Sequence, residues 1–279
     1  MARRTVARSA ERAGIGLHSG AATRVRVSPA PAGTGLVLVR SDVPGARPIS
    51  VGLASVGASE RRTALRSGEQ RVDTVEHLLA AVMAAEYDDL LVEVDGPEVP
   101  ILDGSFAPFV ELLDEAGVSE QPGRARIATL REPVAAEVHG GWYVAEPAAL
   151  GRFAVTLEYR EPVIGRQVAS LELTRGAFAR EVAAARTYGF LAEVAPLRER
   201  GLLAGASEDC AIVLDEARVL NTTLRWPDEF ARHKLGDLLG DLALLGARLR
   251  LAVSAVRPSH RGNIAFARVL AGAVSYGEE

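Results

Sequence analysis

This sequence of 279 residues has a single cysteine, Cys210, so no disulfide can form within the chain and a reducing compartment is indicated. The most apolar stretch, 235–256, carries four charged residues, which excludes a membrane span. No apolar run follows the basic amino-terminal segment, so we expect no secretory signal. A net charge of −4 gives no sign of nucleic-acid affinity. These absences predict a cytoplasmic protein without a nucleic-acid partner or membrane insertion, and we expect a monomer.

Lysine is almost absent from the chain. Lysine and arginine together number 32, and Lys234 is the only lysine, which leaves 31 arginines. A compact ammonium and a broad planar guanidinium do not replace each other at a crowded site. Chance survival is the simplest explanation of the one lysine. However, Lys234 directly follows His233, and this neighbour favours a functional role.

The order of predicted elements divides the chain into two halves. The polar segment 117–126 has glycine and proline but no apolar periodicity, and predicts a linker between domains 1–120 and 121–279. In the first domain, Asp73 and Glu76 predict a capping box for a helix that ends near Ala85. An alternating strand at 90–94, a loop at 100–105 and a helix at 106–116 follow it.

The second half repeats this order with a helix at 227–245, a strand at 250–256, a loop through His260 and a helix at 264–273. His77 lies 26 residues before Asp103, and His233 lies 27 residues before His260. This similar spacing suggests duplicated halves whose marked helices meet at an interface. Additional strands are predicted at 23–28, 35–40, 153–159 and 170–174. The pattern favours an α+β fold of two similar domains over a doubly wound sheet.

Three polar residues are spaced four apart on the leucine-rich helix of the second half. His233, Asp237 and Asp241 therefore share one helical face, where burial is costly unless each side chain has a partner. An imidazole and a carboxylate at positions i and i+4 can bind one metal ion. The alternative is a solvated stripe, but leucines occupy most of the remaining surface. A third ligand must come from elsewhere, and His77, beside Glu76 on the other marked helix, is the best candidate.

The other histidines leave their roles open. His260 follows a strand, where it could protonate a leaving amine and be oriented by Asp241, or it could be an ordinary loop residue. His18 fits a turn as well as it fits a pocket. His139, in a His-Gly-Gly turn, is expected to be exposed and without a role.

Seven short motifs extend over nearly the whole sequence: 14–20 (GIGLHSG), 74–78 (TVEHL), 100–105 (PILDGS), 185–190 (ARTYGF), 207–213 (SEDCAIV), 232–237 (RHKLGD) and 259–260 (SH). In this order they closely resemble the motifs of the UDP-3-O-acyl-N-acetylglucosamine deacetylase family of lipid A synthesis. The resemblance implies two domains of like fold, with two helical layers between two sheets and a metal site at the domain interface. It also implies removal of the acetyl group from UDP-3-O-(3-hydroxyacyl)-N-acetylglucosamine.

The resemblance also implies roles for individual residues. Zinc, or ferrous iron in cells, would be bound by three ligands: His77, His233 and Asp237. Glu76 would be the general base, and His260 the general acid, oriented by Asp241. Thr187 would donate a hydrogen bond to the oxyanion, and Lys234 would lie near the substrate's phosphates or the developing charge.

Substrate contacts follow from the same resemblance. Tyr159 matches an aromatic position that packs on uracil, Tyr188 follows the oxyanion donor, and Arg257 matches a basic position near the diphosphate. An insert at about 191–213 would form an apolar passage for the acyl chain, with surface from Leu191, Val194, Leu197, Leu202 and Leu203.

Three departures from the family pattern affect substrate binding. Gly141 replaces a lysine expected near the phosphates, Glu161 replaces a histidine, and Tyr188 stands where phenylalanine is common. Two alternative functions therefore stay open: a metal amidohydrolase acting on another N-acyl sugar, and a non-catalytic homologue that binds a nucleotide sugar or a protein. The complete set of Glu76, His77, His233, Asp237 and His260 argues against the second.

Overall fold

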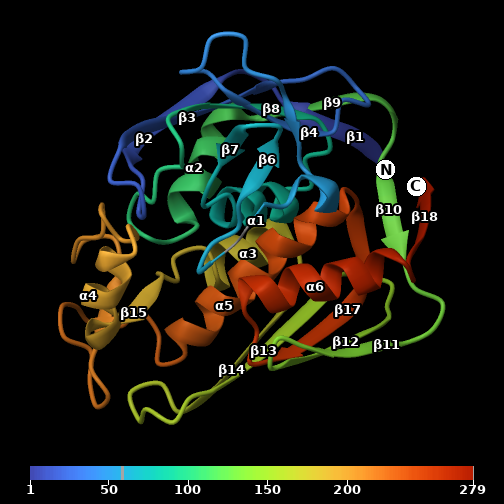
Figure 1. The fold of residues 1–279 in the computed structure, drawn as a ribbon. Helices are drawn as coiled ribbons and strands as arrows, with labels where there is room; N and C mark the ends of the chain where they lie inside the picture. Colours follow the sequence, from blue (N-terminus) through green and yellow to red (C-terminus); the bar gives the residue numbers. More distant parts are fainter. Residues whose placement is uncertain (58–59, 279) are drawn as a thin grey trace.

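The computed structural model describes residues 1–57 and 60–278. In this part of the chain, two sheets form the outer layers and the main helices lie between them (Figure 1). The two chain ends lie on the same side of the molecule, where strands from both halves meet. The predicted α+β class and the sandwich arrangement are confirmed.

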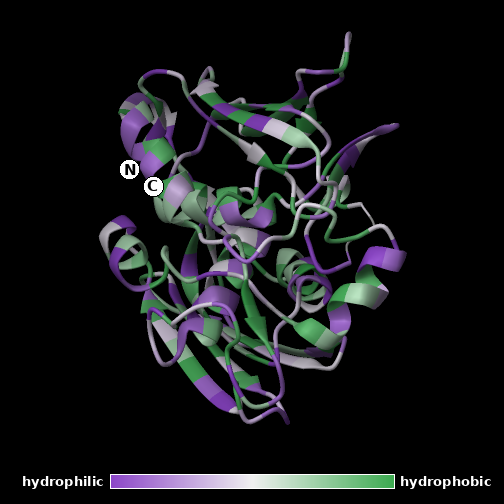
Figure 2. Ribbon diagram, turned by 90° about the vertical axis from the view of Figure 1, so that its left-hand side faces the viewer, coloured by the Kyte–Doolittle hydropathy of each residue, from purple (hydrophilic) through white to green (hydrophobic). Residues whose placement is uncertain are grey.

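The first outer sheet comes from the amino-terminal half and has the strand order β2-β3-β8-β4-β5. Its strands are β2 (Ala10–Ile15), β3 (Ala22–Pro29), β8 (Leu90–Asp95), β4 (Leu36–Arg40) and β5 (Ile49–Ser50). Apolar side chains on β3 and β8 point inward at every second residue, as a sheet with one buried face requires. Figure 2 shows this as alternating purple and green along the strands. Helices α1 (Glu76–Ala84) and α2 (Ala107–Ala116) lie on the inner side.

The second outer sheet belongs to the carboxyl-terminal half and is built around β17 (Arg248–Val256), which pairs with three strands. The strands of this sheet are β10 (Arg126–Thr129), β11 (Val134–Val138), β12 (Gly141–Pro147), β13 (Arg152–Glu158), β14 (Arg166–Glu172), β17 and β18 (Ser275–Glu278). Helices α5 (Glu229–Leu242) and α6 (His260–Ala271) lie on its inner side (Figure 1). A short 3-10 turn, η2 (Ala243–Leu245), extends α5, so the predicted end near residue 245 is correct.

Smaller elements surround the two layers. They are the two-stranded ribbon of β1 (Ala2–Val6) with β9 (Val118–Arg124), the turn η1 (Leu53–Ser55), the hairpin of β6 (Leu65–Ser67) with β7 (Gln70–Val72), helix α3 (Arg175–Glu181), and β15 (Tyr188–Phe190), α4 (Leu191–Glu199) and β16 (Ile212–Leu214). The last three span the segment at about 191–213 that was expected to be an insert, and they lie at one end of the molecule (Figure 1).

The predicted linker is a strand. Residues 117–126 contain β9, which pairs antiparallel with β1, with Val118 opposite Val6. Most side chains of β9 are exposed or half-buried, so the strand needs no apolar alternation, and its partner lies more than 100 residues away in sequence. A local pattern could not reveal this pairing.

The predicted capping box is also wrong. Helix α1 begins at Glu76 and is preceded by Val75, and Thr74 has a φ of 57°, so the backbone turns sharply before the helix. Asp73 instead forms ion pairs with Arg71 and, at 3.0 Å, with Arg62. The Glu76 carboxylate accepts a hydrogen bond from a loop and is not used to cap the helix.

His260 does not lie in a loop, and α6 begins four residues earlier than the predicted position. Its preceding residue, Ser259, accepts the Gly262 N–H through its hydroxyl at 3.2 Å, which is a normal helix cap. His260 is thus held at a helix start, with less freedom than a loop gives.

Helices α1 and α5 make the central contact between the halves. Every residue of α1 is buried, and α5 approaches it through Gly240. A Cβ added at Gly240 would lie 2.1 Å from the carbonyl oxygen of Glu76. Only a residue without a side chain permits this approach.

Among the described residues, no helix is long and apolar enough to span a membrane.

The substitution Gly240→Ala is expected to force α1 and α5 apart, because the new methyl group meets backbone atoms that cannot rotate away. Overpacking of this kind costs about 1–3 kcal/mol of folding free energy. Thermal unfolding of the variant measures this cost. Gly277→Ala is the control, since nothing lies within 4 Å of a Cβ added there. Equal melting temperatures for the two variants would contradict the proposed contact.

Candidate active site

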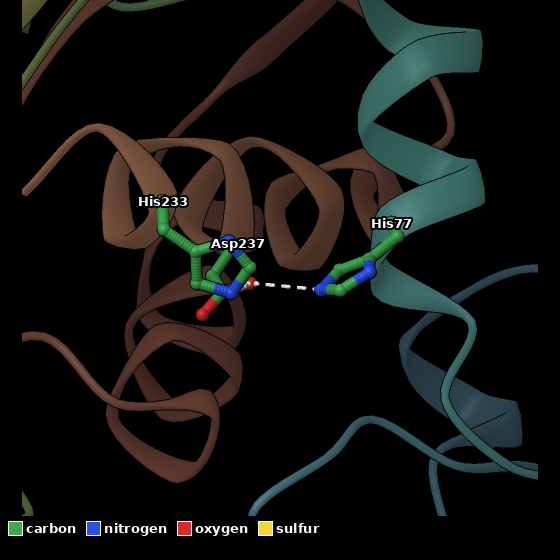
Figure 3. Close-up of side chains that lie close together, drawn as sticks. All are labelled: His77, His233 and Asp237. Carbon is green, nitrogen blue, oxygen red and sulfur yellow. Dashed lines mark ion pairs between the residues drawn. The ribbon is translucent and has the colours of Figure 1, made fainter. Parts of the chain in front are cut away.

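Three side chains from two helices converge at the contact between α1 and α5. His77 approaches from α1, and His233 and Asp237 from α5 (Figure 3). Asp237 Oδ1 lies 3.7 Å from His77 Nε2 and 3.4 Å from His233 Nε2. The predicted face of α5 is therefore real, and His77 is brought to it from the other half of the chain.

This group fits a divalent metal ion. All three side chains are buried, and one ligand atom from each lies within 4.8 Å of the others. Asp237 Oδ1 has no hydrogen-bond partner in the described structure, a costly arrangement unless a cation binds there. His233 Nδ1 lies 3.0 Å from the carbonyl oxygen of Ala185; donation to it leaves Nε2 as an unprotonated ligand. Burial lowers the pKa of His77 to about 3, so its imidazole is neutral. Two imidazoles and a carboxylate suit zinc or ferrous iron.

A carboxylate and an imidazole flank the group. His260 Nε2 lies 3.8 Å from Glu76 Oε1 and 3.7 Å from Asp237 Oδ2. Burial raises the pKa of Glu76 to about 7. For His260, burial alone would lower the pKa, but Asp241, Asp237 and Glu76 raise it to about 9. At neutral pH, His260 is therefore protonated, and Glu76 can accept a proton.

Asp241 organises a buried hydrogen-bond network behind His260. Its Oδ2 atom accepts hydrogen bonds from His260 Nδ1 at 2.9 Å and from Asn263 Nδ2 at 2.8 Å, while Oδ1 accepts from the Thr63 hydroxyl at 2.5 Å. The Tyr143 hydroxyl donates to Asn263 Oδ1 at 2.9 Å. The sequence indicated Asp241 alone. Thr63, Asn263 and Tyr143 come from three separate segments, and no local signal connects them.

A second buried network fixes Thr187 beside the metal group. Arg186 Nε donates to Glu229 Oε1 at 2.9 Å, and the Arg186 N–H donates to the same oxygen at 3.2 Å. Glu229 starts α5, and the backbone N–H of Thr187 donates to Gly104 O at 2.8 Å. The segment carrying Thr187 is thus anchored to α5, the helix that carries His233 and Asp237. Arg186 lies in a motif that the sequence singled out, but its partner could not be predicted.

A cavity of about 640 Å³ opens from this site towards the insert. Near the metal group it is lined by Thr187, Lys234, Glu76, His260 and His18. Tyr188 lies beside Lys234 and His233. The segment that follows contributes apolar side chains from Phe190, Leu191, Val194, Leu197, Leu203 and Val213, and charged ones from Glu193, Arg198 and Glu208. A cavity with polar groups beside the metal group and a largely apolar lining beyond them can accommodate a substrate with a polar head and an apolar chain.

The structure separates the predicted substrate residues into two groups. Tyr159, Tyr188, Leu191 and Val194 line the cavity, whereas Leu202 and Arg257 do not. Leu202 is buried beside the cavity wall, and its neighbour Leu203 has the lining position. Arg257 is exposed, with its nearest acidic partner, Glu158, at 4.0 Å.

Two further histidines had no firm role in the sequence analysis. His18 lines the cavity, and His139 is exposed.

Packing explains why position 141 is glycine and does not carry the lysine that the family pattern led us to expect. A Cβ at this position would lie 2.9 Å from both the Arg257 carbonyl oxygen and the Tyr143 ring. The buried Tyr143 ring and the β17 backbone therefore leave no room for a side chain. Arg261, which lines the cavity one residue after His260, supplies a cation there that the sequence did not reveal.

Lys234 lies at the cavity wall, as its neighbour predicted, and its ammonium donates to Asp237 Oδ2 at 2.7 Å. The same ammonium lies 5.7 Å from the centre of the Tyr188 ring. The lone lysine thus contacts the second oxygen of the carboxylate in the metal group, next to the space for substrate.

The fold is an α+β sandwich with a buried group of two histidines and one carboxylate, and a further carboxylate and imidazole lie beside this group. Such an arrangement is typical of a metal-dependent hydrolase. Residues 3–272 match the family described as UDP-3-O-acyl N-acetylglycosamine deacetylase (LpxC), and the chain belongs to this family. Proteins named UDP-3-O-acyl-N-acetylglucosamine deacetylase from Brucella melitensis, Brucella ovis and Brucella abortus are each 39% identical to it over 262 residues. Each alignment covers 93% of this chain and 92% of the relative.

Removal of one ligand should empty the metal site. His233→Ala is expected to lose the bound divalent ion and activity together, because two ligands are too few for a stable site. Metal analysis of the purified variant measures the ion directly. His139→Ala is the matched control, since that histidine is exposed, and should keep its metal. Full metal content in the His233 variant would refute the ligand assignment.

Proposed function

We propose that this chain hydrolyses the N-acetyl group of UDP-3-O-acyl-N-acetylglucosamine, releasing acetate and leaving a free 2-amino group on the sugar, in the biosynthesis of lipid A. The carrying observation is the His77, His233 and Asp237 group with Glu76 and His260 beside it, at the polar end of a largely apolar cavity. The proposed substrate is the compound for which the relatives are named. We further propose zinc as the resident ion, ferrous iron as its replacement in cells, a cytoplasmic location and a monomer.

The protein groups divide the proton transfers between them. When bound, zinc would polarise the acetamide carbonyl and lower the pKa of a water molecule. Glu76 takes the proton of the attacking water, for which its raised pKa suits it. The Thr187 hydroxyl donates a hydrogen bond to the oxyanion that forms. His260, held by Asp241, then protonates the departing amine, which is otherwise a poor leaving group.

The rest of the substrate follows the cavity. Tyr159 packs on the uracil, Tyr188 lines the space beside Lys234, and the insert around 191–213 receives the acyl chain. Arg257, which is exposed and outside the cavity lining, serves the diphosphate together with Arg261, which lines the cavity. In this proposal the two halves are domains 1–120 and 121–279, and the metal group lies at their interface.

Gly141 and Glu161 support a second candidate, hydrolysis of another N-acyl sugar on the same scaffold, because both replace expected cationic or titratable groups. Turnover of acylated and unacylated UDP-N-acetylglucosamine by the purified protein tests both candidates. We expect efficient turnover of the acylated substrate only. Comparable rates on both, or no turnover of either, would overturn the main proposal.

The rate is expected to depend on pH as a bell-shaped curve. Glu76 must be ionised, so activity rises with pH through a pKa no higher than about 7, since a bound cation lowers it further. His260 must be protonated, so activity falls above a pKa no higher than about 9. Rate profiles of Glu76→Ala and His260→Ala should lose the acidic and the basic limb respectively. Because these groups interact, both values belong to the coupled set. An unchanged limb in either variant would contradict its role.

Lys234→Arg should keep the charge but fail to fit between Asp237 and Tyr188, because the guanidinium is wider than the ammonium. We expect kcat/KM to fall about tenfold or more, equal to about 1.4 kcal/mol, with metal content intact. Steady-state kinetics on the acylated substrate separates the causes. A loss in KM indicates the diphosphate as the partner of Lys234, and a loss in kcat indicates the transition state. Wild-type kinetics would mean that this lysine has no special role.

A further inference from the structure

Thr63 is fully buried, and all three of its polar groups form hydrogen bonds next to the reaction centre. Its backbone N–H donates to Glu76 Oε2 at 3.0 Å, and its hydroxyl donates to Asp241 Oδ1 at 2.5 Å. Its carbonyl oxygen accepts the N–H of Val75, the residue before Glu76, at 3.2 Å. Thr63 therefore connects the start of α1, in the first half of the chain, with α5 in the second half.

The same two carboxylates approach His260 through their other oxygen atoms. Glu76 Oε1 lies 3.8 Å from His260 Nε2, and Asp241 Oδ2 accepts a hydrogen bond from His260 Nδ1 at 2.9 Å. Each carboxylate thus bonds to Thr63 through one oxygen, and the other oxygen lies near one of the two nitrogens of the imidazole. The contacts of Thr63 therefore restrain both carboxylates that lie against His260.

The Thr63 hydroxyl has no substitute at Asp241. In the described part of the chain, Oδ1 accepts no other hydrogen bond, because the amide of Asn263 bonds to Oδ2. Without the hydroxyl, a buried carboxylate oxygen would lack a donor, and the carboxylate could rotate away from His260 Nδ1. Glu76 and Asp241 also repel each other when both are ionised, and donors from one residue to both oppose this repulsion.

We propose that Thr63 is a positioning residue for the acid–base pair. Its hydroxyl fixes the orientation of the Asp241 carboxylate and its N–H fixes that of Glu76, so that His260 is held in one place between them. The roles of Glu76 and His260 rest on the proposed function. Thr63 is not among the residues that line the cavity, so it acts through these partners and does not touch the substrate. Loss of its hydroxyl should slow the proton transfers and leave substrate binding unchanged.

The test compares Thr63→Val, which keeps the shape of the side chain but removes the hydroxyl, with Thr63→Ser, which keeps a hydroxyl. On the acylated substrate, we expect kcat of the valine variant to fall about tenfold or more, because a small misplacement of reacting groups is costly. KM and bound metal should stay at the wild-type values. The serine variant should recover kcat to within about threefold of the wild type. If Thr63→Val does not fold, Thr63→Ala takes its place.

Thr5→Val is the matched control for the loss of a buried hydroxyl. Thr5 is 4% exposed, and its hydroxyl accepts the backbone N–H of Ala30 at 3.1 Å, away from the cavity. Its kinetics should equal those of the wild type. The proposal is overturned if Thr63→Val has the wild-type kcat, or if Thr63→Ser loses as much activity as Thr63→Val.

The position of His260 can also be measured without turnover. The Nδ1–H that it donates to Asp241 gives a downfield ¹H NMR signal, which is identified by its loss in His260→Ala. In the metal-loaded protein, this signal should shift or broaden in Thr63→Val and stay unchanged in Thr5→Val. An unchanged signal in Thr63→Val would overturn the proposal. If the wild-type chain does not hydrolyse the acylated nucleotide but the signal depends on Thr63, the proposed function fails and the positioning of His260 stands.

Discussion

The contact between α1 and α5 is the constraint on which the rest of the structure depends. The sheets of the two halves form the outer layers. Between them, α1 of the first half and α5 of the second half pack against each other, and both carry buried polar residues. The missing side chain at Gly240 lets these helices approach until His77 reaches Asp237 and His233. Glu76 comes to the same place, because it is the residue before His77. Neither half alone carries all three of His77, His233 and Asp237, so the fold as a whole brings this candidate metal group together.

Burial of so many ionisable groups at this contact requires compensation. Glu76, Asp237, Asp241 and His260 are each at most 8% exposed, and isolated charges there would be strongly unfavourable. Asp241 is satisfied by three donors, and its negative charge keeps His260 protonated. Asp237 keeps one oxygen on Lys234 and the other free of hydrogen bonds. The unsatisfied oxygen is the one that faces both histidines, which is where a cation offsets the remaining cost.

Local periodicity was sufficient for much of this arrangement and failed where partners are distant in sequence. The i, i+4 spacing of His233 and Asp237 places both side chains on one face of any helix, so α5 and its site could be predicted. The capping box failed because Asp73 has arginine partners that compete for its carboxylate. The linker failed because β9 is an exposed ribbon strand without an apolar face. The side chains that orient Asp241 lie on three segments, and only the folded chain brings them together.

Four consecutive residues, 60–63, show how the cavity and the reaction centre are mechanically connected. Glu60 and Arg61 form ion pairs with Arg200 and Glu193 on or next to α4, with the charges crossed between the two segments. The next two residues turn inward: Arg62 pairs with Asp73, and Thr63 bonds to both Asp241 and Glu76. The outer pairs are exposed and individually weak, whereas the inner bonds are buried. Residues 60 and 61 thus bond to α4, whose Glu193 lines the cavity, and to the residue after it, whereas residue 63 bonds to the buried carboxylates of Glu76 and Asp241, so a stretch of four residues connects the cavity wall to the group around His77.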